Sequence, residues 1–201
     1  MNEISDLKKY WKSIKGKKDV LTFYSSVKLP ENSPDYNYFS NYWISEDPFN
    51  FTIPEWCGKF KNKKINIHFS IKAIMLCKAS LMGDEQVFND ILECSTPFGC
   101  EKLSNNIACF DENKWLKNII NISFAVVFAK FNSNSELKQK LIDTGERIIA
   151  ETAEYNTFWG IGMDRNNINN QYPTYWKGFN LLGWTLMEVR KKLISENSEN
   201  H

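Results

Sequence analysis

Apolar residues recur at helical spacing through most of the chain after Ser70, and this pattern is the strongest constraint on its fold. It predicts two helices within 70–93, for which Ser70 is a candidate N-cap, and a long helix over 111–131. The second half of the chain is therefore predicted to be mainly α.

Helical patterning continues to the C-terminal end. Ser133 and Glu136 have the spacing of a capping box, so a further helix is expected to start there and to reach about Thr152. A last apolar stripe over 182–193 ends in basic residues, which suit a helix C-terminus. The polar tail 195–201 is expected to be disordered.

The first part of the chain has a different pattern. Residues 21–24 are β-prone, residues 30–34 start and end with proline and predict a turn, and residues 65–69 alternate as a half-buried strand does. A turn over 61–64 would let that strand form a hairpin with the Phe49 region. The fold class predicted is thus a helical single domain with a small β or loop-rich N-terminal part.

One domain over 21–194 is the default for 201 residues. Residues 1–20 form a basic N-terminal extension around Tyr10 and Trp11. It could be a short helix docked by its aromatic residues, a frayed tether, or a solvated basic face.

Composition excludes several classes of function. The 25 Lys and Arg residues against 24 Asp and Glu residues leave a net charge of +1, which gives no long-range field toward a nucleic acid or an anionic membrane. No apolar run approaches a membrane span, and five cysteines without Cys-x-x-Cys spacing suggest reduced thiols in a cytoplasmic protein. Of the two histidines, His68 is interpreted as a structural or surface residue, so neither a metal site nor a cofactor is predicted.

A block of tryptophans and glycines near the C-terminus indicates a ligand pocket. Trp159 and Trp176 offer flat apolar faces, and the glycines at 160, 162, 178 and 183 allow positive φ and close backbone approach. This arrangement suits a nucleobase or a ribose. The alternative is that both tryptophans belong to the core and that the glycines only turn the chain.

Over about residues 21–193 the chain resembles the NADAR family, the YbiA-like N-glycosidases. The matching positions are Phe23-Tyr24, Phe39-Ser40-Asn41, Lys78-Ala79, Gly83-Asp84, Lys102-Leu103, Phe110-Asp111, Trp115, Lys130-Phe131, Leu137, Leu141, Thr144-Gly145, Glu151, Trp159-Gly160-Ile161-Gly162, Trp176, Gly178, Asn180, Gly183 and Leu186-Met187, Val189-Arg190. The resemblance implies a mainly α YbiA-like fold that binds or hydrolyses N-ribosides. These are ribosylaminopyrimidine phosphates of the riboflavin pathway in one branch and ADP-ribosyl groups, including those on guanine, in another.

Cleavage of a C1′–N bond develops oxocarbenium character, so a carboxylate near C1′, a group that handles the departing base and a cation for phosphate are wanted. The residues expected to bind the ligand are Asn41, Lys78, Trp115, Glu151, Asn156, Trp159, Gly160, Trp176 and Asn180. No catalytic residue is assigned.

The chain departs from the family pattern at three charged positions. Ile71 stands where a glutamate is expected, Asn105 where an arginine is expected, and Asn156 where an aspartate is expected. Asparagine keeps the size of aspartate but takes no proton near neutral pH. A local misalignment, with Glu85, Glu151 or Glu154 as the carboxylate, would also account for the pattern.

Three functional hypotheses follow. The first is an N-glycosidase that acts on a phosphorylated or ADP-ribosylated N-riboside. The second is a pseudoenzyme that binds or senses a nucleotide-like molecule, and the third is a structural or interaction protein. The partner expected in the first two is a small molecule, with neither a membrane nor a nucleic acid involved except as an ADP-ribosylated base.

Overall fold

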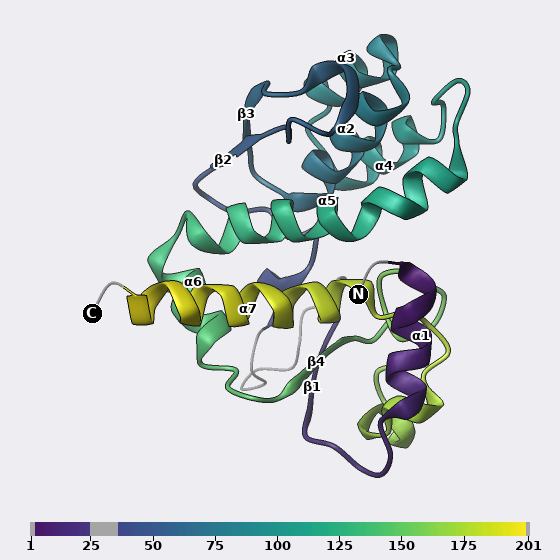
Figure 1. Ribbon diagram of the computed structural model, residues 1–201, viewed down its shortest axis with the longest axis vertical. Helices are drawn as coiled ribbons and strands as arrows, with labels where there is room; N and C mark the ends of the chain where they lie inside the picture. The colour runs from purple at the N-terminus through teal and green to yellow at the C-terminus, as the bar shows by residue number, and fades with distance from the viewer. Residues whose placement is uncertain (1–2, 25–35, 200–201) are drawn as a thin grey trace. The chain divides into compact units, whose positions relative to one another are not determined.

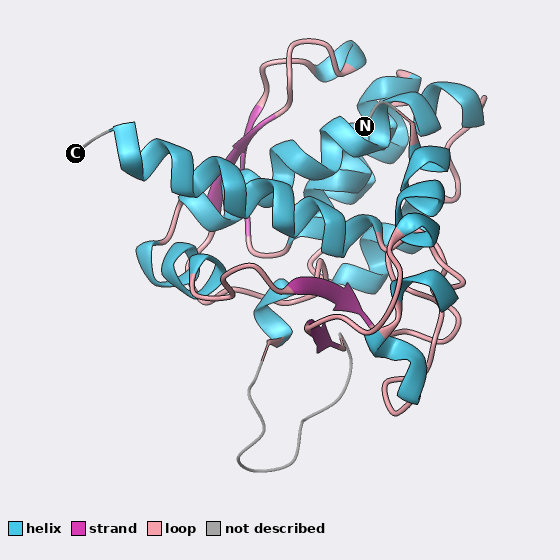
Figure 2. Cartoon of the chain, turned by 60° about the horizontal axis from the view of Figure 1, so that its bottom comes forward, coloured by secondary structure: helices cyan, strands magenta, loops and turns pink. Residues whose placement is uncertain are grey.

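The computed structural model describes residues 3–24 and 36–199, and the fold over these ranges is mainly α (Figure 1, Figure 2). The turn predicted over 30–34 lies outside the described residues. The α-helices are α1 (Ile4–Ser13), α2 (Ser70–Met82), α3 (Glu85–Glu93), α4 (Pro97–Ser104), α5 (Glu112–Asn132), α6 (Ser135–Ile142) and α7 (Leu181–Glu199). The strands are β1 (Val20–Phe23), β2 (Phe49–Thr52), β3 (Lys64–Ile67) and β4 (Ile148–Glu151), and the 3-10 turns are η1 (Asn37–Phe39), η2 (Gly58–Phe60), η3 (Ile168–Gln171) and η4 (Pro173–Tyr175).

The chain divides into two compact units. Unit 1 combines residues 1–40 with 134–201, and unit 2 is the continuous stretch 41–133. Each unit is described by itself below.

Helix α2 lies at the centre of unit 2, where α3, α4 and α5 all pack against it. It is buried on most sides because its sequence is apolar almost throughout. Gly83 ends the helix in the left-handed conformation, with φ of 76°, and the Asp84 carboxylate accepts a hydrogen bond from the Val87 N–H at 3.0 Å to start α3. The two helices predicted within 70–93 are confirmed.

Unit 2 also contains the predicted hairpin. Strand β2 pairs antiparallel with β3, in a register that sets Phe49 opposite Ile67 and Phe51 opposite Ile65. Both phenylalanines are buried, so one face of the hairpin belongs to the core. Asn62 supplies the positive φ of the connecting turn, at 65°.

Unit 1 is built around two parallel strands from opposite ends of the sequence. β1 pairs with β4, Val20 facing Ile148 and Phe23 facing Glu151, and α7 packs on β4. The expected helix that reaches Thr152 is wrong in its second half: α6 ends at Ile142, and the apolar residues after it form β4.

Two predicted helix starts are displaced by one residue. Phe69, not Ser70, is the N-cap of α2. Asn134, not Ser133, caps α6, with its side-chain oxygen 3.0 Å from the Leu137 nitrogen. Phe69 and Asn134 both adopt the extended backbone conformation that an N-cap requires.

Both ends of the described chain are helical. In α1 the Trp11 indole is buried and its N–H donates to the Phe179 carbonyl at 2.6 Å, so this helix is docked by its aromatic residue within unit 1. Helix α7 continues to Glu199, through most of the tail that was expected to be disordered.

Candidate functional site

The start of α2 carries buried polar groups without hydrogen-bond partners. The Ile71 N–H donates to the Asn41 carbonyl at 2.9 Å, which ties the loop before β2 to the first turn of the helix. Asn41 is 3 % exposed and Ser70 is fully buried, yet neither the Asn41 amide nor the Ser70 hydroxyl has a partner among the described residues. Burying such groups unpaired costs about 1–3 kcal/mol each, so a water, ion or ligand that reached them would supply the missing hydrogen bonds.

Ile71 stands next to these groups along the chain, where the family resemblance leads one to expect a glutamate. Its side chain is fully buried within unit 2. An apolar residue packed in this way has no proton to give and no charge to place on a substrate. Lys72, the next residue, donates from its ammonium group to the carbonyls of Leu92 at 2.7 Å and Cys94 at 2.9 Å.

Lys78 lies further along α2 among aromatic rings. Its ammonium nitrogen is 4.8 Å from the centre of the Phe110 ring and 5.8 Å from that of Trp115, and 3.3 Å from the Ser104 carbonyl oxygen. Partial burial lowers the pKa of Lys78, while the negative charge of Glu101 acts in the opposite direction. Lys78 and Trp115, two predicted site residues, therefore belong to one cluster.

The positions around this cluster differ in accessibility. Asn105, at the expected arginine position, is the exposed C-cap of α4. The Glu101 carboxylate accepts a hydrogen bond from the Tyr42 hydroxyl. Sequence reasoning missed Glu101 because its position relative to Lys78 depends on how α4 packs against α2.

In unit 1, Asn180 holds β4 in place. Its side-chain N–H donates to the Ile149 carbonyl at 2.9 Å and its side-chain oxygen accepts from the Glu151 N–H at 3.2 Å. Asn180 is fully buried and has a φ of 49°, so its amide acts on the chain itself. Glu151 is 3 % exposed, and among the described residues it is the one carboxylate that is buried.

The glycines of the 159–183 block bring the chain close to itself. A Cβ at Gly178 would lie 2.1 Å from the Gly160 carbonyl oxygen, and one at Gly160 would lie 2.7 Å from that of Glu151. The Ile161 N–H donates to Glu151 at 2.9 Å. The close approach predicted from the glycines is thus made by the protein's own backbone.

The two tryptophans of this block have different surroundings. Trp176 is 1 % exposed, its N–H donates to the Asn170 carbonyl at 3.1 Å, and its ring centre is 4.9 Å from that of Trp11. It is a core residue in the described conformation. Trp159 is also buried, and its backbone N–H donates to the Asn156 side-chain oxygen at 2.9 Å. Asn156 therefore keeps the acceptor that an aspartate would supply and lacks only the charge.

The other candidate carboxylates lie at the surface. Glu85 is exposed and pairs with Lys59 at 2.7 Å. That ion pair lowers the pKa of Glu85. Glu154 is exposed as well. Neither side chain is shielded from water in the way that a carboxyl group used for acid–base catalysis usually is.

Two other kinds of feature are absent from residues 3–24 and 36–199. No described helix is long and apolar enough to cross a membrane. The same part of the chain brings together no group of three His, Cys, Asp or Glu side chains that could hold a metal ion.

The sequence is similar to those of proteins named as N-glycosidases. The chain is 33 % identical to N-glycosidase R617 of Acanthamoeba polyphaga mimivirus over 119 residues, which is 59 % of this chain and 70 % of the relative. It is 26 % identical to N-glycosidase YbiA of Shigella boydii over 113 residues, 56 % of this chain and 64 % of that protein.

The fold has a solved counterpart. The NMR structure of the E. coli protein YbiA matches with a TM-score of 0.65 at 24 % identity, covering 93 % of this chain and 92 % of that one. Residues 23–194 match the NADAR domain, a range that runs through both units. With most of its length in that match, the chain belongs to the NADAR domain family.

Proposed function

We propose that this chain binds a phosphorylated or ADP-ribosylated N-riboside, in keeping with its N-glycosidase relatives, and that the ligand is held in unit 2 by the start of α2 and by Lys78. The observation that carries this proposal is that the Asn41 amide and the Ser70 hydroxyl are both buried and both lack a hydrogen-bond partner among the described residues. Sugar hydroxyls and phosphate oxygens are the hydrogen-bonding groups that such a pair lacks.

Lys78 supplies the positive charge for the phosphate. Its ammonium lies over Phe110 and Trp115 and is half buried, so an anion beside it would meet a charge that water screens only in part. The flat ring of Phe110 is exposed enough to stack on a base.

Hydrolysis needs a carboxylate to stabilise the oxocarbenium ion or to activate water. Glu151 is the candidate that the sequence supplies, because it occupies a family position and its side chain is buried within unit 1. In this proposal Glu151 stands in for the carboxylate that Ile71 and Asn156 cannot supply.

The second candidate function is binding without cleavage. It is favoured by the fully buried Ile71 and by the uncharged Asn105 and Asn156, which together leave three family charges without a replacement at those positions. A site that keeps its hydrogen-bonding groups and loses its acids can still recognise a nucleotide-like molecule.

One experiment separates the two candidates. The purified chain is incubated with a ribosylaminopyrimidine phosphate, with ADP-ribose and with an ADP-ribosylated guanine nucleoside, and base release and melting temperature are followed in the same samples. Release that is lost in Glu151→Gln but kept in the exposed control Glu154→Gln supports the glycosidase. A raised melting temperature with no release supports the binding protein, and the absence of both with all three compounds refutes the proposal.

A further inference from the structure

Two cysteines of unit 2 lie against each other at the junction of α3 and α4. Cys94 is the residue that follows α3, and Cys100 lies within α4. The Cys100 thiol donates to the Cys94 carbonyl at 3.8 Å and to the Ile91 carbonyl at 4.0 Å. The Cys94 sulfur rests on Gly99: a Cβ at that glycine would be only 2.6 Å from it.

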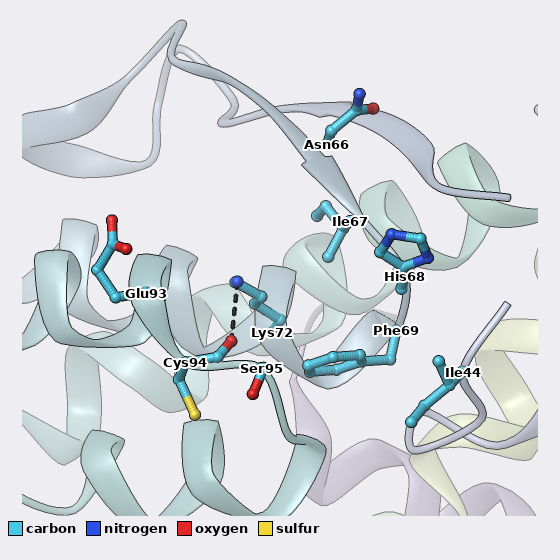
Figure 3. Close-up of a pocket in the computed structure, with 9 residues that line it drawn as sticks. All are labelled: Ile44, Asn66, Ile67, His68, Phe69, Lys72, Glu93, Cys94 and Ser95. Atoms are coloured by element: carbon cyan, nitrogen blue, oxygen red, sulfur yellow. Dashed lines mark hydrogen bonds between the residues drawn. The ribbon is translucent and has the colours of Figure 1, made fainter. Parts of the chain in front are cut away.

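The main chain of Cys94 is fixed from the opposite side. Its carbonyl accepts a hydrogen bond from the Lys72 ammonium at 2.9 Å, and both residues line a cavity of about 290 Å³. Figure 3 shows the carbonyl directed toward Lys72 and the sulfur directed away from it. The thiol is thus held outside the cavity, on the side where α4 begins.

The surroundings give the two thiols different acidities. Partial burial alone would raise the pKa of Cys94, but its hydrogen bonds with Thr96 and Cys100, together with the positive charge of Lys72, outweigh burial and leave the pKa below its ordinary value. Burial raises the pKa of Cys100 to about 12, and the neighbouring Cys94 adds to that shift. The pair therefore combines one thiol that ionises more readily than an ordinary cysteine with one that stays protonated at neutral pH.

The two cysteines also differ in their exposure to solvent. Cys94 is partly exposed, whereas Cys100 is buried. Ser95 and Thr96, the next two residues, are both exposed. Of the two residues, Cys94 is therefore the one that a small molecule in solution meets first.

We propose that Cys94 is a modification site for low-molecular-weight disulfides and that Cys100 is its resolving thiol. The Cys94 thiolate attacks one sulfur of the small disulfide, whose S–S bond breaks, and the first small thiolate leaves with the bonding electron pair. Cys100 then attacks the Cys94 sulfur and expels the second small thiolate, which takes up the Cys100 proton. The protein dithiol is oxidised to a Cys94–Cys100 disulfide, and the small disulfide is reduced to two thiols.

The test uses the full chain, fully reduced and then exposed to oxidised glutathione, with intact mass and peptide mapping as the readouts. The wild type is expected to gain an internal Cys94–Cys100 disulfide. Cys100→Ser should instead accumulate one glutathione adduct on Cys94, because the resolving thiol is gone. Cys94→Ser and Cys94→Ala should lose both products.

Cys109 provides the matched control, since it is exposed and lies outside the pair. Cys109→Ser should form the internal disulfide as the wild type does, and iodoacetamide at neutral pH should alkylate Cys94 before Cys109. Modification of Cys109 first, or a Cys100→Ser protein that carries its adduct elsewhere, would overturn the assignment. Melting curves of the reduced variants identify any that fail to fold, and the alkylation order in the wild type then decides alone.

Discussion

The carbonyl of Asn41 accepts a hydrogen bond from the Ile71 N–H, so the residue with an unpartnered buried amide is fixed to the residue where the family resemblance leads one to expect a glutamate. The hydrogen bond needs only backbone atoms. The loop can therefore keep its place at the start of α2 whatever side chain stands at 71.

Replacing Asn41 by Leu separates ligand binding from stability. Leucine matches asparagine in shape and removes a buried amide that has no partner in the described structure, so the free energy of unfolding should stay the same or rise. The increase in melting temperature on adding ligand should disappear. Differential scanning fluorimetry with and without ADP-ribose measures both effects.

The control for Asn41→Leu is Asn50→Leu, at an exposed position of β2. It should leave the ligand response intact. A large fall in the stability of Asn41→Leu without ligand would show that the amide is structural.

Replacing Ile71 by Glu should destabilise the protein. The side chain is fully buried, so the new carboxylate would be an uncompensated buried charge, at a cost of about 3–5 kcal/mol. Urea unfolding at pH 7 measures this, with Ile71→Leu as the volume-matched control that should cost less than about 1.5 kcal/mol. Equal stability of the two variants would mean that unit 2 still has a place for the family acid.

Lys130 makes stability depend on pH. Its burial lowers its pKa from 10.5 to about 7, while its ammonium lies 5.0 Å from the centre of the Trp43 ring. The unfolded chain therefore binds more protons than the folded one between about pH 7 and 10.5. The contribution of Lys130 to the free energy of unfolding is therefore lowest below pH 7. It rises between pH 7 and 10.5, by up to about 1.4 kcal/mol per pH unit.

Denaturant unfolding at pH 7, 8 and 9 tests this sign against Lys130→Met. The difference in stability between variant and wild type should favour the variant at pH 7 and shrink as pH rises. The exposed control Lys117→Met should give a difference that is the same at each pH. A Lys130→Met difference that also stays constant would contradict the depressed pKa.

Asn180 should be intolerant of change for two separable reasons. Asn180→Gly loses the two hydrogen bonds that hold β4 and should cost about 1–3 kcal/mol. Asn180→Ala loses the same bonds and must also adopt a φ of 49°, which adds about 1–2 kcal/mol. Chemical denaturation of both proteins gives the order, and an alanine variant as stable as the glycine variant would rule out the backbone contribution.

Local patterns predicted the parts of the fold that depend on neighbours in sequence. The α2–α3 pair follows from apolar spacing and from the stop at Gly83, and the β2–β3 hairpin follows from alternation on each side of a turn. Strand β4 was missed because Ile148 and Ile149 fit a helical stripe equally well. Only the pairing with β1, far away in the sequence, makes them a strand.

Some residues of the candidate site could be predicted from the sequence and others could not. Asn41 and Lys78 were expected to bind ligand, and their surroundings in unit 2 suit that proposal. For Trp176, the sequence pattern is the same whether the indole faces a ligand or the core. Its surroundings depend on Trp11, whose ring packs against it from the other end of the chain.

The pairing of Val20 with Ile148 also has a consequence for the order of events during synthesis. Residues 41–133 are continuous, so the contacts within that unit close over short loops as the chain leaves the ribosome. Strand β1 is made before that unit, but its partner β4 is made only after the whole unit has been synthesised. Until then the edge of β1 is unpaired, so newly made chains are most prone to aggregate in that interval.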